Sequence, residues 1–230
     1  MDKTIVSILG GLGGMFGWGI SDFLANFSSD AIGHFKTFFW SQLAGMVLFL
    51  AVGVFLIPEF GITNAFYLAL IVESGIAYAL GYLFFYKAFE IGNVAIVSAL
   101  INLQTIFVMV IAYALYGQRL STYQYPAVLL LLVGVVLVSV DFGQLRKGAV
   151  SLVVGVKETV IAAVMFGILF WPVNEFLVER NDWLPINIYE KTVAIIFILL
   201  IAYIGKKSLS IGQTTAKTRI NLIAVGLLEA

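Results

Sequence analysis

Long apolar stretches separated by short polar connections make up most of the chain. A bilayer core of about 30 Å requires about 20 residues in a helix, and none of the stretches shows the two-residue alternation of a strand. We count eight candidates for spanning helices, at 4–26, 36–57, 65–88, 93–116, 123–141, 155–178, 186–204 and 219 onward. The pattern predicts an all-α polytopic membrane protein that crosses the cell membrane several times.

One pattern of small, aromatic and acidic residues occurs twice. Gly10 to Leu24 reads Gly-x3-Gly-x3-Trp-x3-Asp followed by Phe-Leu, and Ala163 to Leu177 reads Ala-x3-Gly-x3-Trp-x3-Glu followed by Phe-Leu. Matched positions are 153 residues apart. A carboxylate inside a membrane helix costs about 2.5–3.5 kcal/mol and usually marks a partner or a pathway. Asp22 and Glu175 are therefore candidate functional residues.

Glycines form a smooth strip on the first span. We expect helix packing along this strip and at the matching position of the second copy, that is at Gly10, Gly13, Gly14, Gly17 and Gly167. Trp18 and Asp22 lie roughly 100° around the helix from the strip, so they can face a cavity. The alternative is a packing helix in which Asp22 only approaches the interface.

The third and fourth spans carry polar side chains at helical spacing. Tyr78, Tyr82 and Tyr86 follow Ser74 at four-residue steps, a column that either lines a cavity or forms a ridge of packed rings. Glu73 either is a functional carboxylate or makes a structural hydrogen bond to a neighbouring helix. Ser98, Asn102 and Thr105 share one face of the fourth span, and their polar groups must point inward.

The sixth span contains a helix-breaking residue. Pro172 follows Trp171 and leaves the carbonyl of Ile168 without its hydrogen bond. A kink beside Asn174 and Glu175 suits a hinge or binding site on a broken helix, although a plain structural kink explains it equally well.

Composition supports the membrane class and narrows the chemistry. Of 230 residues, 61% are hydrophobic and 11% charged, mean hydropathy is +1.04 and the net charge is +0. These values exclude a soluble domain and give no basis for binding nucleic acid. The chain has no Cys and one His, so we expect no metal, no cofactor and no thiol chemistry.

Two local segments resemble a known family. Tyr86 to Ala95 reads Tyr-Lys-Ala-Phe-Glu-Ile-Gly-Asn-Val-Ala, and Gly117 to Ser121 reads Gly-Gln-Arg-Leu-Ser. With the Gly-Val-rich stretch at 132–136 and Trp18 in the first span, they resemble an EamA-type permease of the drug/metabolite transporter superfamily. Gln118 and Thr105 depart from the family's usual glutamate and proline.

The resemblance implies two five-helix repeats of inverted orientation. We expect residues 1–145 to form the first repeat (helices 1–5) and residues 146–230 an incomplete second repeat (helices 6–8, the last one partial), about 8 of 10 helices in all. The end of the chain supports this reading, because Leu227 to Ala230 resembles Ile71 to Ser74 at an offset of 156 residues. We expect a sequence truncated at its C-terminus; a natural eight-span protein is the alternative.

Inverted repeats place equivalent residues at mirrored depths. We therefore expect Asp22 to lie near Glu229, and Glu73 near Glu175, as two acidic clusters that alternately bind a proton or a cationic solute group. The expected pathway residues are Trp18, Tyr78, Tyr82, Ser98, Asn102, Trp171 and Asn174, with a hinge at Pro172.

These expectations describe a secondary transporter for a small organic metabolite or drug-like solute, coupled to protons by alternating access. Its partners are the solute and the lipid bilayer; the oligomeric state is open. The resemblance points to an inner membrane and to efflux, while the residues leave the direction of transport open. The rival interpretations are a structural or receptor-like membrane protein and an intramembrane enzyme, for which the chain lacks a His or Cys constellation.

Basic residues near the span ends do not settle the sidedness. Four lie on the side of the N-terminus, Lys191 among them, against nine on the opposite side. This count places the N-terminus outside, whereas the family resemblance implies a cytoplasmic N-terminus.

Overall fold

A computed structural model describes residues 3–56, 64–117, 119–122, 124–140 and 152–230. Within these ranges the chain is helical apart from turns and one isolated β-bridge between Val140 and Leu152. The departure at Gln118 and the predicted repeat boundary between residues 145 and 146 lie outside the described residues.

The helices confirm the predicted all-α membrane fold. Among the described residues, five of the eight predicted stretches form helices long and apolar enough to cross a membrane. In chain order the elements are α1 Lys3–Ile32, α2 His34–Leu56, α3 Ala65–Ile91, α4 Val94–Leu100, α5 Leu103–Tyr116, α6 Gln124–Ser139, α8 Val156–Val164, η1 Met165–Phe170, α9 Trp171–Val178, α10 Trp183–Ile204 and α11 Ala216–Leu228.

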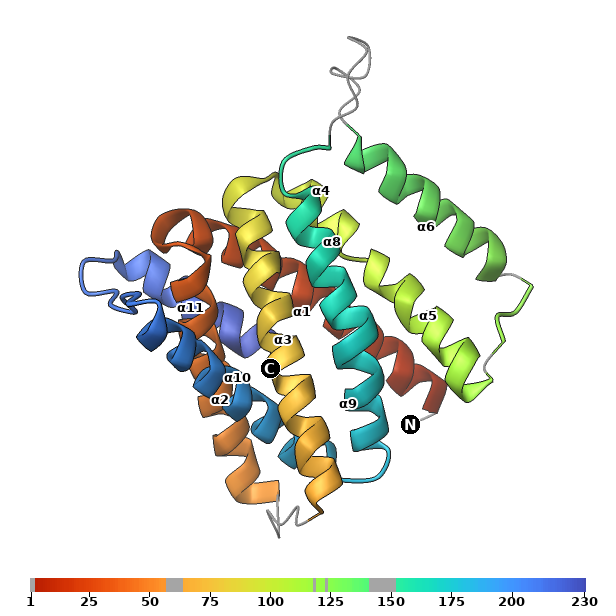
Figure 1. The fold of residues 1–230 in the computed structure, drawn as a ribbon, viewed down its shortest axis with the longest axis horizontal. Helices are drawn as coiled ribbons and strands as arrows, with labels where there is room; N and C mark the ends of the chain where they lie inside the picture. The colour runs from red at the N-terminus through yellow and green to blue at the C-terminus, as the bar shows by residue number, and fades with distance from the viewer. Residues whose placement is uncertain (1–2, 57–63, 118, 123, 141–151) are drawn as a thin grey trace.

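Helix α3 lies at the centre of the molecule. It contacts α1, α2, α4, α8, η1, α9 and α10, whereas α6 lies at the edge and contacts α4 and α5 (Figure 1). Much of the core beside α3 is aromatic: Phe38, Tyr86 and Phe89 are fully buried, and Phe38 stacks on Tyr82 with ring centroids 5.8 Å apart. Part of the tyrosine column therefore packs against the aromatic core, as expected for a ridge of packed rings.

Glycines permit close helix contacts at several crossings. A Cβ at Gly45 of α2 would lie 2.8 Å from the carbonyl oxygen of Gly226 in α11, and one at Gly167 would lie 2.6 Å from that of Gln104. By contrast, a Cβ at Gly10, Gly13 or Gly14 would meet nothing within 4 Å, and one at Gly17 would touch the Leu228 carbonyl oxygen at 3.5 Å. The packing strip predicted on the first span thus finds a neighbour only at Gly17 among the residues described.

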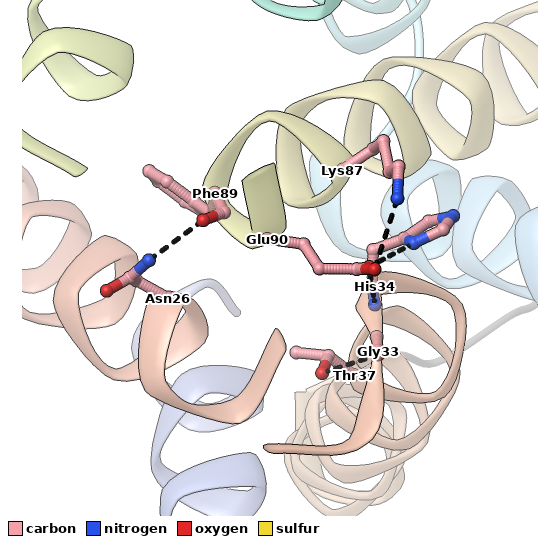
Figure 2. A network of polar contacts seen from close by, with 7 residues as sticks. All are labelled: Asn26, Gly33, His34, Thr37, Lys87, Phe89 and Glu90. Atoms are coloured by element: carbon pink, nitrogen blue, oxygen red, sulfur yellow. Dashed lines mark hydrogen bonds and ion pairs between the residues drawn. The ribbon is translucent and has the colours of Figure 1, made fainter. Parts of the chain in front are cut away.

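A polar network joins the turn between α1 and α2 to the end of α3 (Figure 2). The backbone N–H of His34 donates to Glu90 Oε2 at 2.9 Å, the His34 Nδ1 lies 2.5 Å from the same oxygen, and Lys87 Nζ is 3.1 Å from Glu90 Oε1. Asn26 donates to the carbonyl oxygen of Phe89 at 3.0 Å. These bonds fix the first three helices relative to one another at one end of the bundle.

Candidate solute pathway

A cavity of about 760 Å³ lies between α1, α3, α4–α5, η1–α9, α10 and the end of α11. Eight of the 24 residues that line it are aromatic, and carboxylate, amide and hydroxyl groups lie among them. The structure brings together here all seven residues expected to line a pathway: Trp18, Tyr78, Tyr82, Ser98, Asn102, Trp171 and Asn174.

Two of the helices that form this wall are interrupted at the cavity. The fourth span breaks between α4 and α5 at Ile101–Asn102, and the Asn102 side chain donates to the carbonyl oxygens of Ser98 and Ala99 at 3.0 and 3.2 Å. These bonds supply donors to carbonyls that a regular helix would satisfy with its own backbone.

The sixth span changes to a π-helix over Met165–Phe170, just before Pro172. The backbone N–H of Trp171 reaches back five residues to the carbonyl oxygen of Phe166. The irregularity predicted from Pro172 is therefore a six-residue π segment that aims Trp171 into the cavity, and π segments in α-helices often occur at functional sites.

The two tryptophans of the repeated pattern meet across the cavity. Their ring centroids are 6.3 Å apart, and Trp171 Nε1 donates to Gln104 Oε1 at 3.3 Å. A second cavity of about 430 Å³ shares Trp18, Trp171, Gln104 and Thr105 with the first. The tryptophan pair thus forms part of the lining of both cavities.

Asp22 faces the first cavity with part of its carboxylate free of protein donors. Ser98 Oγ donates to its Oδ2 at 3.0 Å, the one hydrogen bond that this side chain makes among the described residues. Asp22 also lies within electrostatic range of Glu229. A carboxylate with this much unused acceptor capacity can bind a cation or a proton from the cavity.

Glu229, also predicted as a coupling residue, has its acceptors more fully engaged. Its Oε1 accepts from Ser21 Oγ at 3.0 Å and from Tyr86 Oη at 2.5 Å, and its Oε2 accepts from Gln42 Nε2 at 3.2 Å. The donors come from α1, α3 and α2, so this carboxylate joins three helices to the end of α11. Asp22 and Glu229 lie together, as expected, but their hydrogen bonding fits them for different roles.

Two charged residues of α10 belong to the site although neither was predicted to. Glu190 is 2% exposed and accepts from Ser74 Oγ at 2.6 Å and from Asn174 Nδ2 at 2.8 Å. Lys191 is 5% exposed and donates to Gln42 Oε1 at 2.8 Å and to the Tyr78 hydroxyl at 3.2 Å. Both side chains line the first cavity.

Lys191 was counted among the basic residues of the loops and span edges, and this assignment is wrong. Helix α10 begins at Trp183 rather than at residue 186, so Lys191 lies in its third turn and inside the bundle. Trp183 and Pro185 indicate the earlier start of this helix, because tryptophan favours the membrane interface and proline favours the first turn of a helix. Without Lys191, three basic residues remain on the side of the N-terminus against nine.

Residues 5–140 match the sequence profile of the EamA-like transporter family. The match covers more than half of the chain, from the first span to the end of the fifth. The chain belongs to the EamA-like transporter family. Among curated proteins, none matches it.

An EamA-like protein of this kind is a membrane transporter of the drug/metabolite superfamily. The matched segment carries Asp22 and the tyrosine column, whereas Trp171, Glu190, Lys191 and Glu229 lie beyond it. One cavity therefore combines side chains from the matched segment with side chains from the following part of the permease.

The other two predicted coupling residues of the permease do not line the first cavity. Glu73 is half-buried and lies within electrostatic range of Glu190, and its Oε2 is buried without a hydrogen-bond partner among the described residues. Glu175 is exposed and lines the second cavity together with Pro172 and Glu179. A coupling role for either carboxylate stays a prediction.

Proposed function

We propose that this EamA-like permease moves a small organic cation through the first cavity in exchange for a proton, by alternating access. The observation that carries the proposal is the Asp22 carboxylate, which faces an aromatic cavity with free acceptor capacity. A buried acid that binds either a proton or a cation, but not both, is the element that an exchanger requires.

The lining of the cavity favours a positive charge on the solute. Three carboxylates, those of Asp22, Glu190 and Glu229, face it together with one basic side chain, that of Lys191. Trp18 and Trp171 present rings 6.3 Å apart, and the faces of tryptophan rings attract organic cations. The aromatic walls also suit an apolar body on the solute.

The broken helices support the alternating movement. The break at Ile101–Asn102 and the π segment at Met165–Phe170 lie on α4–α5 and η1, which contact each other beside the cavity. Transporters commonly place their binding sites at interrupted helices of this kind. Pro172, predicted as a hinge, directly follows the π segment.

Binding of a cation that cannot lose its charge tests the proposal. In a variant with Trp40→Phe and Trp183→Phe, the remaining tryptophans are Trp18 and Trp171. We expect benzyltrimethylammonium to quench their fluorescence saturably, because the probe would lie in the cavity against their rings. Asp22→Asn in the same background should weaken this binding by about tenfold or more.

Benzyl alcohol, which has the same ring and no charge, is the matched control probe. A binding curve for benzyltrimethylammonium that is absent, or that Asp22→Asn leaves unchanged, would refute the proposed site.

A further inference from the structure

The charge of Lys191 lies deep in the bundle without a direct acidic partner. Among the described residues, no carboxylate oxygen lies within 4.0 Å of its Nζ atom. Its hydrogen bonds go to two neutral oxygens, and its Nζ also lies 5.4 Å from the ring centroid of Phe49 and 5.3 Å from that of Tyr78. A buried cation of this kind in a membrane helix is expensive and usually has a function.

Gln42 connects this cation to an acid without letting the two touch. Its carbonyl oxygen accepts from Lys191 at 2.8 Å and from Tyr78 at 3.0 Å, while its amide nitrogen donates to Glu229 at 3.2 Å. The amide dipole is therefore aligned between a positive and a negative group. Glu190, the neighbour of Lys191 in sequence, also lies within electrostatic range of its ammonium group.

This arrangement leaves Lys191 between two carboxylates whose acceptors the protein has already engaged. Glu229 accepts three hydrogen bonds from protein side chains, and Glu190 accepts two, from Ser74 and Asn174. Asp22, in contrast, keeps unused acceptor capacity toward the cavity. The ammonium group thus offsets one unit of the negative charge that a solute would otherwise meet.

We infer that Lys191 is the resident counter-cation of the cavity and limits how many positive charges a bound solute carries. The inference rests on the proposed function, because it concerns the cation that the permease would bind. Removing the lysine charge makes the site more negative by one unit, and a solute with one additional positive charge should then bind better relative to a singly charged one.

Two probes with the same ring and different charge test this inference. Benzyltrimethylammonium carries one positive charge, and para-xylylenebis(trimethylammonium) carries two. Their affinities are measured by quenching of Trp18 and Trp171 in the background with Trp40→Phe and Trp183→Phe. We expect Lys191→Gln to raise the affinity of the dication relative to that of the monocation by about tenfold or more, and Lys191→Arg to keep the ratio of the parent protein.

The ratio separates a charge effect from a packing effect. A merely structural lysine would change both affinities together, and Lys191→Gln would then leave their ratio within about twofold of the parent value, which overturns the inference. If instead the parent protein binds neither probe, the proposed function fails. An altered ratio that Lys191→Arg shares with Lys191→Gln would also contradict the inference, since arginine keeps the charge.

Discussion

Replacing Asp22 with Asn should reduce proton-driven exchange of benzyltrimethylammonium by about a hundredfold or more. The amide keeps the size of the side chain and can still accept from Ser98, but it can neither bind a proton nor balance a cation. A charge interaction in a low-dielectric site is worth a few kcal/mol, and about 1.4 kcal/mol corresponds to a tenfold change. The measurement is uptake of the probe into proteoliposomes under an imposed pH gradient, with a trapped pH-sensitive dye to report the proton movement.

Asp30→Asn is the matched control for this experiment. Asp30 is an exposed residue near the end of the same helix, α1, and lies outside both cavities. The control should exchange the probe at the rate of the parent protein. Undiminished exchange in Asp22→Asn would remove Asp22 from the mechanism, and an equal loss in both variants would point to a general effect on the helix.

Replacing Gln42 with Leu should destabilise the bundle by about 3 kcal/mol or more. Gln42 is 1% exposed and serves three side chains at once, those of Lys191, Tyr78 and Glu229. Leucine has a similar volume but leaves a buried ammonium group and a buried carboxylate each short of a partner, which costs far more than a surface hydrogen bond. Denaturation of the purified protein in detergent, followed by circular dichroism, measures the loss.

Gln104→Leu provides the comparison with the same residue change. Gln104 is half-buried and accepts one bond of 3.3 Å from Trp171, so its replacement should cost about 1 kcal/mol or less. Equal stabilities of the two variants would show that the network around Lys191 does not hold the helices together.

Much of the pathway could be predicted because it depends on positions within single helices. The repeated spacing placed Trp18 and Trp171 in equivalent positions and predicted that both line the pathway, whereas the contact between their rings is seen only in the structure. Polar side chains in a membrane helix are expected to face inward, and this rule selected Ser98, Asn102 and Thr105, which all line the cavity although Asn102 and Thr105 are exposed.

The network around Lys191 could not be predicted, because it depends on how different helices are rotated against one another. Gln42, Tyr78, Lys191 and Glu229 lie on four segments, α2, α3, α10 and the end of α11, and no spacing in the sequence connects them. The glycine strip shows the opposite difficulty. Its pattern is clear, yet a Cβ at Gly10, Gly13 or Gly14 would meet nothing within 4 Å in the described part of the chain.

The form of the break in the sixth span also could not be predicted from the sequence. Pro172 marks the place, but the chain responds with a π segment before it, where Gly167 allows the backbone to approach Gln104. Proline removes one hydrogen bond and leaves the neighbouring turns to adjust. The π segment packs against α5, a contact between helices that the sequence of one span does not show.

A single introduced cysteine tests the central claim most directly, because the chain has no cysteine of its own. Ser98→Cys places a thiol on the cavity wall beside Asp22, and Val47→Cys, at a side chain 68% exposed on α2, is the comparison. In proteoliposomes, a water-soluble trimethylammonium thiosulfonate reagent should modify the thiol at position 98 and spare that at position 47, and benzyltrimethylammonium should protect position 98. An unreactive thiol at position 98, or equal modification of both thiols without protection, would contradict a solute pathway through this cavity.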